Sequence, residues 1–181
     1  MARGIGVHVA LLRAINVGGN NKLPMQDLRA MFDAAGCTDV RTYIQSGNVV
    51  FGASTTLART IPAVVGDAIE SRFGFRPPIV MRTADELREV SGRNPFDGLT
   101  SEPKLLHVAF LSEAPKRGAR LDPARSPGDR FEVRGRDVYL YYPNGTARSK
   151  LDNPYLERCL GATSTMRNWR TVTQLVELIE S

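Results

Sequence analysis

The amino-acid sequence predicts an α+β protein in which helices pack against antiparallel sheets. Two observations carry this prediction. Short apolar runs of strand length return through tight turns rich in Gly and Asn, and amphipathic helices with recognisable ends lie between them. A chain of 181 residues with 42% hydrophobic content is long enough for one large domain or two small ones, each with its own core.

The first predicted elements are a strand over residues 6–12 and a helix over residues 24–35. Pro24 suits the first helical turn because its missing amide hydrogen costs nothing there. Apolar side chains then recur at spacings of three and four residues, which places them on one face of the helix. Gly36 is expected to end the helix in a left-handed conformation.

A hairpin, a second helix and a further strand follow. Residues 40–44 and 49–51 are predicted strands joined by a tight turn at Ser46-Gly47-Asn48, and residues 78–81 form the last strand. The order strand, helix, strand, strand, helix, strand is that of a ferredoxin-like unit, with both helices on one face of the sheet. The sequence therefore predicts a ferredoxin-like domain over residues 1–83.

Residues 84–181 are predicted to form a second α+β domain that ends in a helix. Thr83 and Glu86 make a capping box for its first, short helix. Thr171 and Gln174 are interpreted as a further capping box for the C-terminal helix. The segment 115–125 is rich in Pro and Gly and does not favour a helix. The predicted strands are residues 105–111, 131–133 and 138–142.

The two parts share one local pattern. Residues 131–139 and residues 43–51 each read as a strand, a polar turn containing Gly, and a returning strand. Any hairpin needs these ingredients, so the pattern alone raises the hypothesis of a structural duplication without establishing it.

Composition narrows the class of protein. The 24 Lys and Arg residues exceed the 19 Asp and Glu residues, which gives a net charge of +5 and permits an anionic partner, although the basic residues are interspersed with acids. Cys37 and Cys159 lie far apart, which favours a reduced, cytoplasmic protein, and with His8 and His107 they lack the spacing of metal ligands. No signal peptide, membrane span, metal site or cofactor is predicted.

Residues 16–22 form a loop with little apolar content, two glycines, three asparagines and a lysine. Gly18 and Gly19 allow backbone amides to point towards an anion, and Arg13 with Lys22 would add positive charge. Phosphate would suit such a site, although the spacing is neither that of a P-loop nor that of a dinucleotide fingerprint. An ordinary polar turn is the alternative interpretation.

A second polar segment, residues 163–173, contains the single Trp of the chain with Arg and Asn beside it. It would provide an anion pocket before a helix, or a Trp platform for a base. Alternatively, Trp169 fills the core while Arg167 and Arg170 are solvated. Lys150 is either a further basic contribution or an ordinary surface lysine.

Three strings carry a resemblance to a known family: LLRAINVGGNNKLPM, YIQSGNVVF and TMRNWRTV. In this order they resemble a bacterial family known as domain of unknown function 1697 (DUF1697), over nearly the whole chain. The resemblance implies a two-part α+β fold with a ferredoxin-like first part, and it assigns no catalytic role to any residue. The motif residues that it implies are Arg13, Asn16, Gly18, Gly19, Asn20, Lys22, Gln45, Ser46, Asn48, Arg167, Asn168, Trp169 and Arg170.

The sequence favours binding over catalysis. Arg, Asn, Gln and Gly dominate the candidate residues, with no evident nucleophile, metal set or acid–base pair. We therefore expect binding of a phosphate-bearing small molecule, a nucleotide or RNA through these residues and Lys150. The alternatives are an enzyme that acts on a small anionic substrate and a protein–protein interaction module. We also expect the segment around Trp169 to lie within reach of the 16–22 loop or the 45–48 turn.

Overall fold

The computed structural model describes residues 4–181 and divides them into two compact units. Unit 1 contains the chain up to Leu87 together with Leu175–Ser181, and unit 2 contains Arg88–Gln174. Residues 1–3, which belong to the predicted first domain, lie outside the described range. Among residues 4–181, no helix combines the length and the apolar character needed to cross a membrane.

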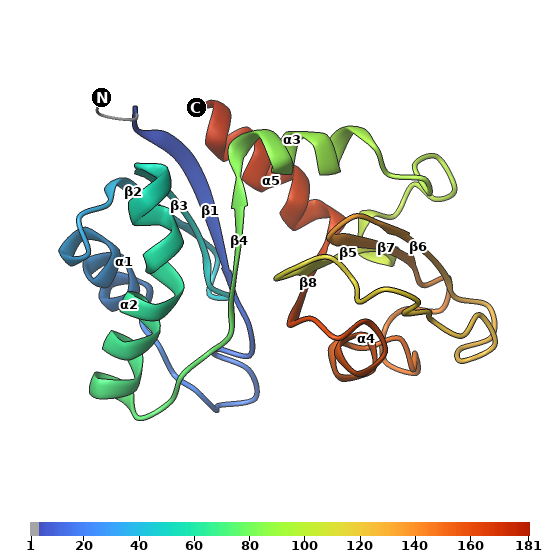
Figure 1. Cartoon of the computed structure of the whole chain (residues 1–181). Helices are drawn as coiled ribbons and strands as arrows, with labels where there is room; N and C mark the ends of the chain where they lie inside the picture. Colours follow the sequence, from blue (N-terminus) through green and yellow to red (C-terminus); the bar gives the residue numbers. More distant parts are fainter. Residues whose placement is uncertain (1–3) are drawn as a thin grey trace. The chain divides into compact units, whose positions relative to one another are not determined.

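Unit 1 is a four-stranded antiparallel sheet covered by two helices. The sheet has the order β2-β3-β1-β4, and α1 and α2 lie on the same side of it (Figure 1). This arrangement confirms the ferredoxin-like prediction. The elements are β1 (Gly6–Leu12), α1 (Met25–Ala34), β2 (Thr38–Tyr43), β3 (Asn48–Ala53), α2 (Thr55–Phe73) and β4 (Ile79–Thr83), followed by α3 (Ala84–Gly92).

The core of unit 1 lies between the sheet and its two helices. Alternate residues of a strand point to opposite faces, so one set of strand side chains meets the helices. Phe32 of α1 contacts Phe51 of β3, with ring centroids 5.0 Å apart, and both side chains are buried. The core also contains Ala10, Leu12, Leu28, Val49, Ile61, Val65 and Ile69.

Unit 2 repeats the sheet but not all of the helices. Its antiparallel sheet has the order β6-β7-β5-β8, the same order as in unit 1. No α-helix forms between β5 and β6, in agreement with the Pro and Gly content of residues 115–125. The elements are a 3₁₀ turn η1 (Pro103–Leu105), β5 (Leu106–Leu111), β6 (Arg130–Arg134), β7 (Asp137–Tyr141), α4 (Asn153–Leu160), β8 (Ser164–Asn168) and α5 (Trp169–Glu180).

Two elements of unit 2 were not predicted from the sequence. The α4 helix has only eight residues, although Asp152 caps its N-terminus and Gly161 (φ 73°) ends it in the left-handed region. Strand β8 reads Ser-Thr-Met-Arg-Asn, so it lacks the apolar pattern of a strand. Its pairing with β5, a buried apolar strand, makes it a strand.

The predicted capping box at the C-terminal helix is wrong. Helix α5 begins at Trp169, so Thr171 lies in its first turn, and the backbone N–H of Thr171 donates to Asn168 Oδ1 (2.9 Å). Asn is a stronger N-cap than Thr, and here it comes first along the chain. The capping box at α3 is confirmed: Glu86 N donates to Thr83 Oγ1 (3.2 Å) and Thr83 N donates to Glu86 Oε2 (2.8 Å).

The two sheets correspond residue by residue. Strand β1 contains His8-Val9-Ala10 and strand β5 contains His107-Val108-Ala109. Val9 pairs with Arg82 of β4, and Val108 pairs with Arg167 of β8. This shared register supports a structural duplication more strongly than the hairpin pattern did.

The helices that follow the fourth strands divide between the units. The part of α3 from Arg88 onwards belongs to unit 2, where Tyr139 Oη of β7 donates to the Val90 carbonyl (3.0 Å). The part of α5 from Leu175 onwards belongs to unit 1, where Arg41 of β2 donates to Ser181 Oγ (2.7 Å). That the two predicted parts are independent domains stays a prediction.

Candidate functional site

In unit 1, the loop after β1 and the turn between β2 and β3 form one structure. Asn16 Nδ2 donates to the carbonyls of Leu23 and Gln45, both at 2.9 Å, and Asn16 Oδ1 accepts from Leu23 N at 2.8 Å. Asn21 Nδ2 closes the loop by donating to the Ala14 carbonyl (2.9 Å). We call residues 13–23 together with residues 44–48 the loop–turn surface.

The turn is anchored to β1 by packing as well as by hydrogen bonds. Leu12 N donates to the Gly47 carbonyl (2.9 Å). A Cβ on Gly47 would lie 2.7 Å from Leu12 Cβ and 2.8 Å from Ile15 Cδ1, so only glycine fits at this position. Asn48 is fully buried, and its Nδ2 donates to the Tyr43 carbonyl (3.1 Å) and to Ser46 Oγ (2.9 Å). Asn16, Asn48 and Gly47 therefore order this surface from within.

Backbone strain is concentrated on the loop–turn surface. Five described residues other than glycine have positive φ, and four of them lie here: Ala14 (56°), Asn16 (54°), Asn21 (49°) and Ile44 (49°). Asn tolerates this conformation, whereas Ala and the β-branched Ile do so at a cost of about 1 kcal/mol or more. Unit 2 joins its corresponding strands, β6 and β7, through only two residues, so the sheet does not require the strained turn.

The outer part of the loop is open to solvent. Gly18 (φ 57°) and Gly19 (φ 80°) form the corner of a turn closed by Asn20 N and the Val17 carbonyl (3.0 Å). A Cβ at either glycine would meet no atom within 4 Å, so these glycines are required by the backbone conformation and not by crowding. Their N–H groups have no acceptor among the described residues. Lys22 is exposed and forms no ion pair within residues 4–181.

The candidate residues of unit 2 lie at the junction of β8 and α5. Arg167 is buried, contrary to the interpretation that it is solvated, and Nη1 donates to Thr165 Oγ1 (2.8 Å) and to the Met166 carbonyl (2.9 Å). Burial lowers the pKa of its guanidinium to about 10, so it remains charged at neutral pH. Asn168 caps α5, Trp169 is half-buried in its first turn, and Arg170 is exposed.

The structure links some of the predicted residues by hydrogen bonds and assigns others to unit 2. Asn16 is hydrogen-bonded to Gln45, and Asn48 to Ser46, whereas Arg167, Asn168, Trp169 and Arg170 belong to unit 2. Lys150 lies before α4, where its backbone N–H donates to Ser126 Oγ (3.3 Å). That the Trp169 segment meets the loop–turn surface stays a prediction.

One residue of the same kind was missed by sequence reasoning. Arg82 of β4 is the counterpart of Arg167: both are buried, and Nη1 of each donates to the carbonyl of the preceding methionine (2.8 and 2.9 Å). The repeated Met-Arg pair, followed by a capping residue and a helix, was the signal that would have found it.

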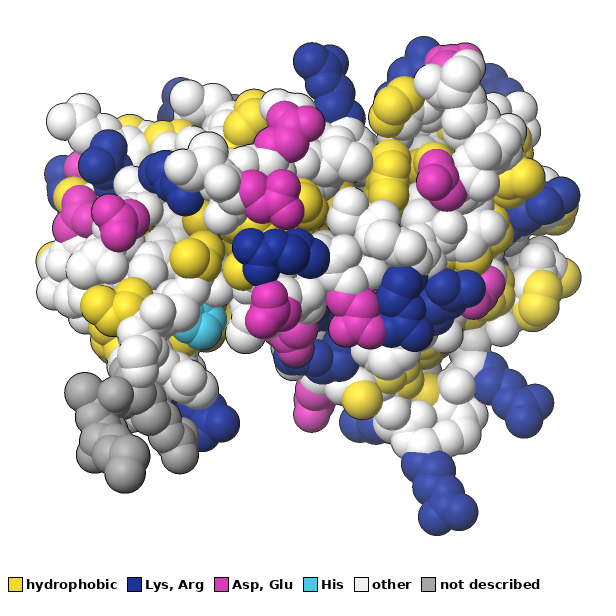
Figure 2. Space-filling view, turned by 90° about the horizontal axis from the view of Figure 1, so that it is seen from above, with side chains coloured by type: hydrophobic (Ala, Val, Ile, Leu, Met, Phe, Trp, Pro, Cys, Tyr) yellow, Lys and Arg dark blue, Asp and Glu magenta, His cyan; other side chains and the backbone are white. Residues whose placement is uncertain are grey.

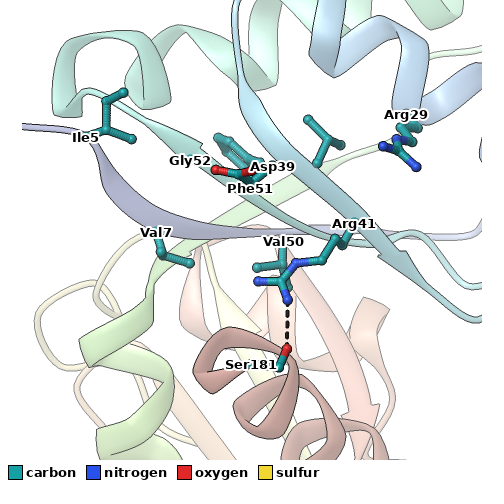
Figure 3. A pocket seen from close by; sticks show the side chains of 10 residues that line it. Ile5, Val7, Arg29, Asp39, Arg41, Val50, Phe51, Gly52 and Ser181 are labelled. Carbon is teal, nitrogen blue, oxygen red and sulfur yellow. Dashed lines mark hydrogen bonds between the residues drawn. The ribbon is translucent and has the colours of Figure 1, made fainter.

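A second feature that the sequence did not predict is a pocket of about 590 Å³ in unit 1, beside the edge strand β2 (Figure 3). The guanidinium of Arg41 points to Ser181 across it, and Arg41 Nε is buried without a hydrogen-bond partner. Apolar and charged side chains share its lining: Ile5, Val7, Val50, Phe51, Arg29, Asp39, Arg41 and Ser181.

Cys37 and His107 are poorly placed for chemistry at neutral pH. Burial raises the pKa of the Cys37 thiol to about 11, so the reactive thiolate is scarce. Burial lowers the pKa of His107 to about 4, so this ring is neutral. His8 Nε2 lies 3.2 Å from the Ala53 carbonyl, a structural contact. Among residues 4–181, no group of three His, Cys, Asp or Glu side chains is arranged as a metal site.

These features define a class: an α+β protein with two four-stranded antiparallel sheets of the same strand order and one strained, internally ordered polar surface. The chain belongs to the family described as Protein of unknown function (DUF1697), whose model matches residues 5–139. The family predicted from the motifs is therefore confirmed; the match contains the first two motifs and ends before the third, at residues 165–172.

A solved structure has the same fold. It is that of conserved bacterial protein SP0830 from Streptococcus pneumoniae, with a TM-score of 0.70, 17% sequence identity, and coverage of 97% of this chain and 99% of that one. At this identity the likeness shows the fold alone. No curated protein matches the sequence.

Proposed function

We propose that this protein binds a phosphate-bearing small ligand at the loop–turn surface of unit 1. The observation that carries the proposal is that a strained loop, ordered by its own asparagines, presents two glycine N–H groups and a lysine that have no partner within residues 4–181. Gly18, Gly19 and Lys22 supply the donors. Strain of this kind clusters at binding and catalytic sites, where the surrounding structure maintains it.

The hydrogen bonds that this surface can donate are sufficient for weak or moderate affinity for a phosphate group. A hydrogen bond to a charged group contributes about 1.5 to 3 kcal/mol, and ordering of the loop before binding removes part of the entropic cost. Two or three such bonds to one phosphate group correspond to a Kd of roughly micromolar to millimolar. Arg13, at the start of the loop, is half-buried and would add positive charge to the same surface.

The test is an NMR titration of the full chain with inorganic phosphate, pyrophosphate and a panel of nucleotides, at low and at high salt. We expect the amide signals of Gly18 and Gly19 to shift, and binding to weaken as salt rises because the contacts are ionic. Lys22→Gln should reduce the affinity about tenfold.

Arg59→Gln is the matched control. Arg59 is an exposed cation of α2 in the same unit, and it forms no ion pair among the described residues. The Arg59→Gln substitution should leave the affinity for phosphate compounds unchanged. The absence of binding by every phosphate compound, or equal effects of the two substitutions, would overturn the proposal.

A second function is favoured by a different observation, the apolar side chains of the same surface. Val17 is 64% exposed and Ile44 is 51% exposed, and Ile44 holds its strained φ without being buried. An interaction with another protein through this surface would bury both. This second function predicts that the double substitution Val17→Ser with Ile44→Asn weakens binding to a protein partner and leaves phosphate binding intact.

A further inference from the structure

The net positive charge of the chain comes entirely from unit 2. Unit 1 contains nine Lys and Arg residues and nine Asp and Glu residues, so its net charge is zero. Unit 2 contains 15 basic and 10 acidic residues, a net charge of +5. The face shown in Figure 2 carries basic and acidic side chains intermixed, so the imbalance has to be located from individual contacts.

Within unit 2, basic side chains gather around α4 and the loops beside it. Lys116 packs its side chain where a Cβ on Gly161 would lie, at the C-terminal end of α4. Arg125 and Arg158 both lie over the ring of Tyr155, at 5.1 and 5.6 Å from its centroid. The backbone N–H of Lys150 donates (3.3 Å) to Oγ of Ser126, the residue that follows Arg125 in the chain. We call Lys116, Arg125, Lys150 and Arg158 the α4 basic surface.

None of these four cations is neutralised by contact with a carboxylate. All four side chains are exposed, and none forms an ion pair among the described residues. The neighbouring carboxylates accept hydrogen bonds from other groups: Asp122 from Ala124 N, Asp129 from Ser126 Oγ, Asp152 from Tyr155 N and Glu157 from Ser164 N. The acids of this region therefore order the backbone while the cations face solvent.

Tyr155 orders the two arginines. Its ring is buried, and its hydroxyl accepts from Asp122 N (2.9 Å), so it is a fixed platform. Cation–π contact with this ring restrains both guanidinium groups and leaves their N–H donors available. Arg is suited to phosphate because its planar donors match phosphate oxygens in pairs.

The spacing of the cations favours a polymer over a single phosphate. An eight-residue helix is about 12 Å long, and the four cations are distributed from before its N-terminus to its C-terminal end. One phosphate group cannot contact all of them. A nucleic acid strand places a phosphate about every 3.4 Å along the helix axis, so it offers several over this length.

A membrane surface fits less well. Amphipathic membrane-binding elements insert apolar side chains between the lipid headgroups. The exposed large hydrophobic residues of the described chain include none from residues 112–130 or 143–161, the segments that form this surface. The surface is basic without being amphipathic.

We propose that unit 2 binds nucleic acid through its phosphodiester backbone at the α4 basic surface, without regard to base sequence. This site is made of other residues than the loop–turn surface, and the proposal does not depend on the ligand proposed there. RNA and DNA share the backbone chemistry, so both are expected to bind.

The test is fluorescence anisotropy of labelled 30-nucleotide RNA and DNA of two unrelated sequences with the full chain, at several salt concentrations. Arg125→Gln with Arg158→Gln should weaken binding about tenfold, and should lower the slope of log K against log salt by about 1.4, the value for two lost contacts to a single strand. Lys150→Gln, which leaves Tyr155 covered, should lower the slope by about half as much.

The control is Arg59→Gln with Lys104→Gln, which removes two positive charges from exposed sites outside this surface; Lys104 is paired with Glu102 (2.8 Å), and Arg59 forms no ion pair among the described residues. It should change affinity less than twofold. Equal loss in the control would show a general charge effect and overturn the proposal. So would the absence of binding to both oligonucleotides, or binding to vesicles containing phosphatidylglycerol in place of nucleic acid.

Discussion

Asn16 is the residue on which the order of the loop–turn surface depends most directly. Asn16→Ala removes three hydrogen bonds of 2.8 to 2.9 Å, two to Leu23 and one to Gln45. Each is worth about 1 kcal/mol net, and water replaces part of the exposed bond to Gln45, so about 2 kcal/mol is lost. Alanine at φ 54° costs about 1 kcal/mol more. We expect unit 1 to lose about 3 kcal/mol.

Asn16→Gly separates the two contributions, because glycine adopts this φ without strain. It should destabilise by about 2 kcal/mol, with a further part arising from the greater freedom of glycine in the unfolded chain. Asn20→Ala is the matched control, since Asn20 is exposed and its side chain makes no hydrogen bond among the described residues.

The assay is urea denaturation together with hydrogen exchange at the Leu23 amide, which donates to Asn16 Oδ1. Exchange at this amide should accelerate strongly in both Asn16 variants and remain unchanged in Asn20→Ala. A loss below about 0.5 kcal/mol in Asn16→Ala, with unchanged protection of Leu23, would refute the view that this side chain holds the loop to the turn.

Two further predictions concern the turn and unit 2. Gly47→Ala should lower the free energy of unfolding by about 2 to 3 kcal/mol, because the new Cβ would lie 2.7 Å from Leu12 Cβ and the backbone has φ 75°. Gly18→Ala has open space around it at φ 57° and should lower it by only about 1 kcal/mol. Equal losses of stability in thermal unfolding would contradict this reasoning. The pKa of His107 is about 4 in the folded protein and 6.5 in the free group, so between these pH values the unfolded chain binds more protons than the folded chain. The free energy of unfolding should therefore fall by up to about 3 kcal/mol as the pH drops from 6.5 to 4. His107→Leu should remove this component of the pH profile, and a profile unchanged by the substitution would show that another group titrates.

The two units show where the chain departs from what its fold requires. Both sheets use the same strand order and the same register around the His-Val-Ala strand, yet only unit 1 has the Asn- and Gly-containing loop of residues 16–22 and the strained four-residue turn. Only unit 2 has the excess of basic residues. A feature that only one of the two units has is not needed to build the sheet that both share. The polar loop and turn of unit 1 and the basic residues of unit 2 are therefore candidates for a functional role.

Much of unit 1 followed from local sequence. The helical spacing of Leu28, Met31 and Phe32, and the Gly turn before Val49, specify short-range structure whose energy depends on neighbouring residues. Strand β8 and helix α4 did not follow, because β8 is a strand through its pairing with β5 and α4 is short enough to lack a clear period. The start of α5 was misplaced for a local reason: Asn168 precedes the Thr171 that was taken as the cap.

The sequence by itself determined the α+β class, the ferredoxin-like order of elements and the identity of the polar loop, because these depend on periodicity, turn residues and motifs close together in the chain. Only the tertiary structure decided what the polar residues do. It assigned Asn16 and Asn48 to internal hydrogen bonds, buried Arg167 beside Thr165, and placed Arg125 and Arg158 on one tyrosine ring. These roles depend on contacts between residues far apart in the chain, and a residue's type does not reveal which partner the fold will bring to it.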